Sequence, residues 1–368
     1  MKILYFAPIP YHGLRQRPQY LADGLAKEHD VIYVEPTISW LKYVIKGGTK
    51  PGRTLHTEPS GVKVLQLNGT YLLPRFAEGI WSGFGFLERM QLRSLIKSAD
   101  AIWIGFEPWF DLLRDFPEKV IYDKMDDNAS ITRNPLMRRL ICRTAPQLLR
   151  RADVLFVSAQ QFYDEANERG LHPVLVPNAV DICQSQTDAP IFEKEAGTKV
   201  FGYIGVLAHW FDLEAIRIIL DASPMNRVVL VGPEEIERVN DSRIRYIGSV
   251  PKSKVGAWID SFDVCLYPFQ QSSLLDTINP VKIYEYLAKN KPVIAVKSKE
   301  TEHFTSKLQL YSNMDQLRQL AATTIDAPFK TEEERKEFIQ KNSWEQRTNI
   351  VLKRLKSEEP QEKNFTFG

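Results

Sequence analysis

Short runs of apolar and β-branched residues alternate with amphipathic segments along nearly the whole chain. In the first half, strands are predicted at residues 2–7, 31–35, 62–67, 101–105, 120–123, 154–158 and 174–177, with helices between several of them, for example at 19–27 and 135–150. This alternation is typical of a parallel sheet covered by helices. The first half is therefore predicted to form a doubly wound α/β domain.

A second series of the same kind follows. Its strands are predicted at 199–204, 228–231, 244–247, 264–267 and 292–296, and its helices near 212–222, 252–261, 280–289 and 314–324. A chain of 368 residues also exceeds the usual size of one hydrophobic core. Two doubly wound domains in tandem are expected.

The boundary is expected after "LVPNAVDI", where a Pro-Asn turn and then a polar stretch interrupt the periodicity. The predicted division is an N-terminal domain at 1–180 and a C-terminal domain at 181–341. A helix at 342–357, opened by a capping-box-like Ser343 and Gln346, is expected to pack back toward the N-terminal domain. The polar tail at 358–368 is expected to be flexible.

Composition and charge narrow the class of protein. Hydrophobic residues make up 43% and charged residues 26%, as in a globular enzyme or binding protein. The net charge of +2 gives no global argument for nucleic acid. Cys142, Cys183 and Cys265 are too far apart for a zinc site or a disulfide framework. With no signal-like segment and no apolar run of about 18 residues, a cytoplasmic protein is expected, at most resting on a membrane face.

Tandem doubly wound domains bind ligands at the carboxyl ends of their strands, so a cleft between them is the expected site. In the second half, Gly205 follows the strand "KVFGYI" and allows close backbone approach, and Asp212 can cap the next helix. Gly232 follows the strand "RVVLV", and the loop "QQSSLLDTINP" follows "DVCLYPF". Candidate binding residues therefore follow several strand ends.

The stretch "NPVKIYEYLA" reads as a helix with Asn279 as N-cap and Pro280 at the first helical position. Lys282 and Glu285 lie three residues apart on it. They could form an exposed ion pair that contributes roughly 0.2–0.5 kcal/mol. Alternatively, they could bind a nucleotide diphosphate, with Lys282 facing a phosphate at the helix N-terminus and Glu285 accepting from a ribose diol.

Two common nucleotide-binding signatures are missing from the chain. Neither "GVLAHW", which follows a predicted strand, nor "APIPYHG" contains G-x-G-x-x-G, and no Walker lysine loop occurs. A hydride-transfer enzyme and a P-loop kinase are therefore disfavoured.

In the first half, the stretch "VIYDKMDDNASI" places Asp123, Asp126 and Asp127 at or just after a strand end. A single carboxylate there could deprotonate a hydroxyl nucleophile. In the alternative reading, Asp127 and Asn128 cap a helix and Asp123 orients a loop. Metal binding by the three carboxylates lacks a confirming spacing.

The opening stretch "APIPYHGLRQRPQYLADGLA" places His12, Gly13, Arg15 and Arg17 before a helix. The arginines could hold a phosphate or carboxylate of a second substrate. They could equally be surface charges, with Gly13 serving a turn and His12 solvated.

Two basic stretches, "RNPLMRRLICRTAPQLLRR" and "SWLKYVIKGGTKPGR", mix cations with bulky apolar residues. Such segments can rest on anionic lipid, where each basic residue contributes on the order of 1 kcal/mol. A solvated helix face with its other side in the core explains them as well.

The tandem organisation and five motifs together resemble a known family. "VPNAVD", "GYIGVLAHWFD", "YIGSVPKSKV", "DVCLYPF" and "NPVKIYEYLAKNKPVIA" occur in the order found in GT-B glycosyltransferases, particularly the bacterial exopolysaccharide, capsule and teichuronic acid transferases akin to glycosyltransferase family four. The resemblance implies an α/β protein with two Rossmann-like domains facing each other across a cleft. It also implies an enzyme, a hexosyltransferase, that moves a sugar from a nucleotide-diphosphate sugar to a lipid-linked or polysaccharide acceptor.

Within this resemblance, the second domain holds the donor. Glu285 matches the later glutamate of the family's Glu-x7-Glu element, which binds the donor ribose, and Lys282 matches a phosphate-facing lysine. The earlier glutamate falls at Thr277, so Asp276 or Asn279 would contact the sugar differently. The donor is expected to carry UDP, with GDP or dTDP as alternatives, and no separate cofactor or metal is expected.

The remaining donor contacts implied by the resemblance come from strand ends. Val250 in "YIGSVP" matches the segment that lines the base, and Gly205 matches the glycine beside the diphosphate. The expected donor-binding set is Gly205, Gly232, Val250, Asp276, Thr277, Asn279, Lys282 and Glu285.

The first domain is expected to hold the acceptor. Asp126 resembles the acidic residue near the acceptor hydroxyl: it would be the base of an inverting enzyme, or would only position the acceptor in a retaining one. Asp126 and Lys282 are the expected catalytic residues. The expected acceptor-binding set is His12, Gly13, Arg15, Arg17 and Asp127. Two other functions fit the sequence, a non-hydrolysing nucleotide-sugar epimerase and a catalytically silent binding partner in a polysaccharide assembly complex.

Overall fold

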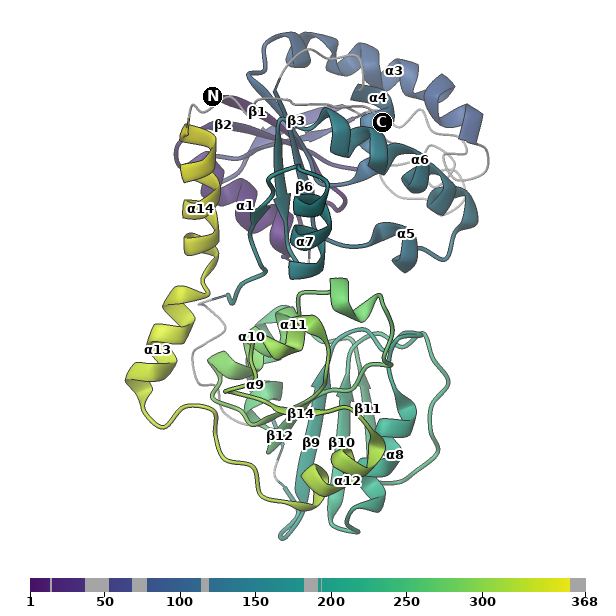
Figure 1. The fold of residues 1–368 in the computed structure, drawn as a ribbon, viewed down its shortest axis with the longest axis vertical. Coiled ribbons are helices and arrows are strands. Elements are labelled where there is room, and N and C mark those ends of the chain that lie inside the picture. Colours follow the sequence, from purple (N-terminus) through teal and green to yellow (C-terminus); the bar gives the residue numbers. More distant parts are fainter. Residues whose placement is uncertain are drawn as a thin grey trace. The chain divides into compact units, whose positions relative to one another are not determined.

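A computed structural model describes residues 1–13, 15–36, 53–67, 78–113, 119–181, 191–192 and 194–357, without the side chains of 78–87 (Figure 1). The chain forms two compact units. The first comprises Met1–Pro177 together with the segment that begins at Arg347, and the second comprises Asn178–Gln346. Cys183, most of the basic stretch at 39–53 and the tail at 358–368 lie outside the described residues.

The first unit is built on an eight-stranded sheet. Its strands are β1 (Lys2–Phe6), β2 (Asp30–Val34), β3 (Thr54–Thr57), β4 (Lys63–Gln66), β5 (Ala101–Ile104), β6 (Lys119–Lys124), β7 (Val154–Val157) and β8 (Val174–Leu175). Their spatial order is β3-β4-β2-β1-β5-β6-β7-β8, and all neighbours are parallel except β3 and β4. The chain order reverses between β1 and β5, which is where doubly wound sheets bind ligands.

Helices cover this sheet (Figure 1). They are α1 (Arg17–Ala26), α3 (Glu78–Lys97), the 3-10 turn η1 (Glu107–Trp109), α4 (Phe110–Leu113), α5 (Asn128–Ile131), α6 (Pro135–Arg151), α7 (Gln160–Glu168) and α14 (Trp344–Lys356). Helix α6 begins as its sequence indicates, because Asn134 accepts hydrogen bonds from the backbone of Leu136 and Met137 and Pro135 needs no donor. The core of the first unit contains a row of aromatic rings carried by β2, β1, β5 and β7.

That row of aromatic rings runs from Tyr33 through Tyr5 and Trp103 to Phe156. Successive ring centroids lie 5.5, 5.1 and 5.3 Å apart and the rings are nearly parallel. All four side chains are fully buried. Parallel strands that are covered on both faces read as continuous apolar runs, which explains why the sequence predicts them well.

The second unit is a six-stranded, all-parallel sheet. Its strands are β9 (Lys199–Ile204), β10 (Asn226–Val231), β11 (Ile244–Gly248), β12 (Val264–Tyr267), β13 (Val293–Val296) and β14 (Gln309–Tyr311), in the order β11-β10-β9-β12-β13-β14. Its helices are α8 (Leu213–Asp221), α9 (Lys252–Asp260), η3 (Leu275–Thr277), α10 (Val281–Ala288), α11 (Lys299–Glu302), α12 (Met314–Ala322) and α13 (Glu332–Lys341). The chain order reverses between β9 and β12.

Two predicted helix caps are confirmed in the structure. The Asp212 side chain accepts from the backbone of Glu214 at 2.9 Å and of Ala215 at 3.2 Å, at the start of α8. Ser343 accepts from the Gln346 backbone at 3.2 Å, at the start of α14. Both short polar side chains therefore satisfy backbone donors that a helix leaves unpaired.

The predicted cap of α10 is wrong. Helix α10 starts at Val281 with Pro280 at the cap position and without a side-chain cap bond. The Asn279 amide is directed elsewhere, because it accepts from the Asn178 backbone at 2.8 Å and donates to Glu300 at 2.6 Å. The Asn279 side chain, which the local pattern predicted as the helix cap, forms tertiary hydrogen bonds with Asn178 and Glu300 instead.

Candidate functional site

The predicted donor residues of the second unit follow four neighbouring strands. Gly205 comes directly after β9, Gly232 after β10 and Val250 two residues after β11. The segment from Asp276 to Glu285 comes between β12 and β13. Because these strands are parallel, all of these residues follow the carboxyl-terminal ends of the strands, on one side of the sheet. The chain order reverses in this region.

Lys282 and Glu285 contact each other on α10. The Lys282 Nζ lies 2.8 Å from Glu285 Oε2. The two side chains differ in exposure, with 28% of Lys282 accessible and only 6% of Glu285. The pair is therefore not the solvated one of an ordinary helix face, because the carboxylate is buried and the ammonium is presented from it toward solvent. A buried carboxylate of this kind keeps its cationic partner in place.

Gly205 and Gly232 are packed backbone against backbone. A Cβ built on Gly232, whose φ is +141°, would lie 1.9 Å from the Gly205 carbonyl oxygen. The Gly205 amide donates to the carbonyl of Val231 at 2.9 Å. Glycine at position 232 is therefore required by the close approach of two strand ends, independently of any ligand.

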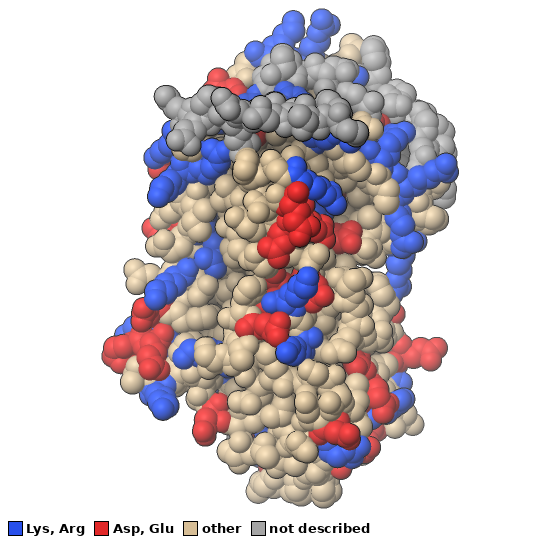
Figure 2. Space-filling model, in the orientation of Figure 1, with Lys and Arg blue, Asp and Glu red and all other residues tan. Residues whose placement is uncertain are grey.

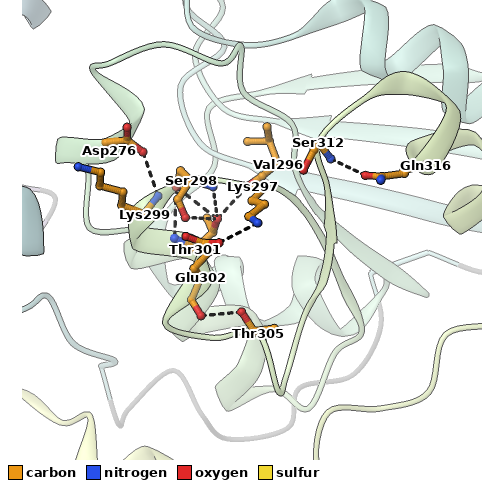
Figure 3. A network of polar contacts seen from close by, with 10 residues as sticks. All are labelled: Asp276, Val296, Lys297, Ser298, Lys299, Thr301, Glu302, Thr305, Ser312 and Gln316. Carbon is orange, nitrogen blue, oxygen red and sulfur yellow. Dashed lines mark hydrogen bonds and ion pairs between the residues drawn. The ribbon is translucent and has the colours of Figure 1, made fainter.

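The polar residues before α10 hold the neighbouring loops together. Asp276 accepts from the Lys299 backbone at 2.9 Å, at the start of α11 (Figure 3). Ser298 and Thr301 form a reciprocal capping box on the same short helix. Thr277, where the family pattern has a glutamate, is buried and donates its hydroxyl to the Leu274 carbonyl at 2.7 Å. This part of the edge is shaped by hydrogen bonds within the unit.

In the first unit, three carboxylates near the end of β6 have separate environments. Asp123 is fully buried, and the buried guanidinium of Arg17 donates to both of its oxygens. Asp127 caps α5, accepting from the Ser130 backbone at 3.2 Å and from the Ser130 hydroxyl at 2.6 Å. Among the described residues these carboxylates do not converge as a metal-binding group. The predicted cap by Asp127 is confirmed, whereas the predicted cap by Asn128 is wrong, because its amide donates to Glu107. Asp123 lies within β6 and is paired with Arg17.

Asp126 is the carboxylate of this stretch with a shifted titration. Burial is the main cause that raises the pKa of Asp126 to about 6. The positive charges of Arg17 and Lys124 oppose this rise, and the nearby Glu107 and Asp123 add to it. The residue as a whole is of intermediate exposure. A carboxylate with a pKa near 6 can hold a proton taken from a hydroxyl near neutral pH.

A buried network supports the loop that carries Asp126. Glu107 in η1 is 2% exposed, and it accepts from the Tyr122 hydroxyl and from the Asn128 amide, each at 2.9 Å. This network ties the end of β6 to α5. Glu107 was not among the sequence candidates, because its partners Tyr122 and Asn128 are 15 and 21 positions away and no local pattern connects them to it.

A pocket of about 320 Å³ lies next to the loop that follows β1. Three of the predicted acceptor-binding residues, His12, Gly13 and Arg15, line it. It is completed by residues that the sequence did not single out: Tyr11, Asp23, Glu58, Pro59 and Ser60. Asp23 is contacted by the Tyr11 hydroxyl and by the Arg15 guanidinium.

Arg17, another predicted acceptor-binding residue, has a different environment. Its side chain is only 4% exposed. Besides Asp123, it donates to the Val176 carbonyl at 2.5 Å. The guanidinium thus links α1, β6 and the end of the first unit, and it does not line the pocket beside β1.

The basic helix α6 has one face in the core. Leu140, Ile141, Thr144 and Leu148 are buried, whereas Arg133, Arg138, Arg139, Arg143 and Arg150 are exposed. Some of these arginines have partners on the same unit: Arg138 donates to the carbonyls of Ala129 and Thr132, and Arg143 lies 3.2 Å from Asp111. On the face drawn in Figure 2, basic and acidic side chains are interspersed.

Two doubly wound units, each with polar residues after the strand ends around its switch point, define the GT-B fold. Solved structures share it over nearly the whole chain. HepE of Anabaena in complex with UDP and glucose has a TM-score of 0.69 at 13% identity, covering 97% of this chain and 100% of that one. A trehalose-6-phosphate protein of E. coli bound with UDP-2-fluoro glucose has a TM-score of 0.69 at 11% identity, covering 98% and 100%.

Sequence comparisons give a narrower relationship for part of the chain. Residues 198–324 match the family described as glycosyl transferases group 1. A protein of Bacillus subtilis (strain 168), named as the teichuronic acid biosynthesis glycosyltransferase TuaH, is 25% identical over 217 residues. This match covers 52% of the chain and 54% of that protein, so the chain spans about half the length of the curated relative. In the described residues, no helix has the length and apolarity needed to span a bilayer.

Proposed function

We propose that this protein is a glycosyltransferase that moves a sugar from a nucleotide-diphosphate donor to a lipid-linked or polysaccharide acceptor in bacterial cell-surface polysaccharide synthesis. One observation carries the proposal: the candidate donor residues lie at a single sheet edge, inside the segment that matches glycosyl transferases group 1. The relationship to a protein named for teichuronic acid biosynthesis supports the acceptor class.

On the donor side, Lys282 supplies positive charge to the departing diphosphate. Its ammonium is partly exposed at the start of α10, where helix backbone amides also favour negative charge. Glu285 accepts from the ribose hydroxyls, exchanging part of its contact with Lys282 for the ligand. Gly205, Gly232 and Val250 form the backbone surface for the diphosphate and the base.

The contacts to the donor sugar fall to the segment before α10. Asp276, Thr277 and Asn279 are already engaged in hydrogen bonds within the unit. We propose that they shape the sugar pocket and that the backbone they hold makes the contacts. UDP is the proposed nucleotide, since UDP is the nucleotide in the solved structures that share the fold.

On the acceptor side, Asp126 takes the proton from the attacking hydroxyl, as its raised pKa permits. His12, Gly13 and Arg15 contact the acceptor at the pocket beside β1. Arg17 and Asp127 affect acceptor binding indirectly, by holding the backbone around the site. Arg17 does so through its pairing with Asp123, and Asp127 by capping α5.

A donor screen followed by a transfer assay tests the proposal. Thermal shift is measured with UDP-, GDP-, dTDP- and ADP-sugars, because a ligand at 100 times its Kd stabilises the native state by about 2.7 kcal/mol. We expect stabilisation by a UDP-sugar, and sugar transfer once a lipid-linked or glycan acceptor is added. Epimer formed from the nucleotide sugar alone would instead identify an epimerase. Binding with neither transfer nor donor hydrolysis would identify a catalytically silent partner.

We further propose a cytoplasmic protein in peripheral contact with an anionic membrane through the exposed arginines of α6. Co-sedimentation with vesicles of neutral lipid, with and without anionic lipid, measures this. Arg139 and Arg150 are exposed on α6, and replacing both by Glu should abolish binding to anionic vesicles. Equal sedimentation of the wild type with both kinds of vesicle would contradict the proposal.

A further inference from the structure

Three potential metal ligands from separate stretches of the first unit converge beside the pocket. They are His12 in the loop after β1, His56 on the edge strand β3, and Glu58 in the turn after β3. One ligand atom from each lies within 4.8 Å of the others. The side chains of both histidines are largely exposed, with 64% of His12 and 48% of His56 accessible.

The two imidazoles approach the same carboxylate oxygen. His12 Nε2 lies 3.1 Å from Glu58 Oε1, and His56 Nε2 lies 2.9 Å from that atom. The two rings are stacked, with centroids 5.8 Å apart and planes 8° from parallel. Two ligands of one tetrahedral zinc ion lie about 3.3 Å apart, given metal–ligand bonds of roughly 2.0–2.2 Å. The two nitrogen–oxygen separations differ from that value by about 0.4 Å or less, and the third pair of ligand atoms lies within 4.8 Å.

The carboxylate is the fixed member of the group. Only 14% of the Glu58 side chain is exposed, compared with 64% for His12 and 48% for His56. Its backbone amide donates to the Val62 carbonyl at 2.8 Å, and its own carbonyl accepts from Gly61 at 2.9 Å. The tight turn between β3 and β4 therefore holds the carboxylate in position, and an Nε2 atom of each ring lies within 3.1 Å of its Oε1.

We propose that His12, His56 and Glu58 bind a divalent transition-metal ion, with Zn²⁺ as the best match. Two imidazoles and one carboxylate are a donor set that zinc accepts, and they leave a fourth coordination position open. His12 and Glu58 also line the pocket beside β1, so the bound ion adds positive charge at its rim. The proposal does not rest on the glycosyltransferase assignment.

Equilibrium titration of the full-length protein with ZnCl₂, in competition with a chromogenic zinc chelator, tests the site. We expect one equivalent bound by the wild type. Loss of one ligand, in His56→Ala or His12→Ala, should weaken binding by at least about 100-fold, since a zinc ion with four ligands derives a large share of its affinity from each. Glu58→Gln should also weaken it, because an amide oxygen lacks the charge.

The matched control is His303→Ala. His303 is 50% exposed and lies 4.0 Å from one carboxylate, Glu300, so this variant should bind zinc like the wild type. Far-UV circular dichroism without metal checks that the variants remain folded, and two ligand histidines from different segments give independent tests. The proposal would be overturned if the wild type failed to bind zinc, or if His56→Ala and His12→Ala bound zinc as tightly as the wild type does. No sugar donor or acceptor is present, so the result is separate from any test of glycosyl transfer.

Discussion

Asp126 shows how one carboxylate is set apart from its neighbours. Asp123 is paired with Arg17, and Asp127 accepts a backbone hydrogen bond as a helix cap. Asp126 lies between these residues in the chain, and burial raises its pKa to about 6. Burial disfavours the charged form of a carboxyl group and so raises its affinity for a proton. A base that removes a proton from an attacking hydroxyl needs this property.

This raised pKa predicts the pH dependence of the reaction. The base acts in its deprotonated form, so kcat/KM should fall about tenfold for each pH unit below about 6 and reach a plateau above it. Asp126→Asn should reduce kcat by about 100-fold or more and remove this limb of the profile. Initial rates across pH measure both effects.

Asp164→Asn, an exposed change on α7, is the control and should keep the wild-type profile. An Asp126→Asn enzyme with full turnover and the same acid limb would show that another group carries the proton.

At the scale of single residues, the sequence predicted the groups whose neighbours in the chain explain them. The cap at Asp212 depends on amides two and three residues away, and the cap at Asp127 on one three residues away. The pairing of Arg17 with Asp123 spans 106 positions, and His56 on β3 stacks on His12 in the loop after β1. Such contacts are set by tertiary packing, so local spacing carries no signal for them.

Among the elements, α10 and α8 form a natural comparison. Each carries an i,i+3 ion pair, but the Arg217–Glu214 pair on α8 is about half exposed on both sides, whereas Glu285 on α10 is buried beneath Lys282. Exposed pairs contribute little, typically below about 1 kcal/mol. The pair on α8 is therefore solvated, whereas on α10 the buried Glu285 carboxylate fixes the position of the Lys282 ammonium.

This comparison gives a matched pair of variants. Lys282→Ala should lower kcat by about 100-fold, comparable to the loss of one preorganised donor to a developing charge. Arg217→Ala should leave kcat unchanged and alter stability by no more than about 0.5 kcal/mol. Steady-state kinetics with a donor found by the screen measures the first effect, and chemical denaturation the second. Equal kinetics for the two variants would remove Lys282 from the mechanism.

Most strands were predictable because both faces of the sheets are covered. Strand β3 was not, because all four of its residues are exposed at the edge of the sheet and "TLHT" has no apolar run. Strand β14 is only three residues long and is an edge strand of the sheet in the second unit. Edge strands are defined by the neighbour they pair with, and the chain around them gives little periodic signal.

At the scale of the whole molecule, helix α14 completes the first unit against α1. A Cβ added to Gly24 would lie 2.3 Å from Thr348 Oγ1 and 2.5 Å from its Cγ2. Lys356, at the other end of α14, contacts Glu28 at 2.6 Å. The absence of a side chain at position 24 allows the two helices to pack closely.

Overpacking in Gly24→Ala is expected to cost about 1–3 kcal/mol. The gain of about 1 kcal/mol that alanine brings to a helix interior offsets part of this cost, so a net destabilisation of up to about 2 kcal/mol is expected. Thr348→Ala in the same chain should recover part of the loss by removing the two nearest atoms. Urea denaturation of both single variants and the double variant gives the coupling free energy. A more stable Gly24→Ala protein would mean that α14 does not pack as described.

The division of the chain has a consequence for biosynthesis. The first unit begins at Met1, is interrupted at Pro177, and resumes at Arg347 after the whole of Asn178–Gln346 has been made. Synthesis of the first unit therefore starts before that of the second and is completed after it. Until α14 is synthesised, the surface of α1 around Gly24 lacks the helix that packs on it. The second unit can fold before the first unit is complete.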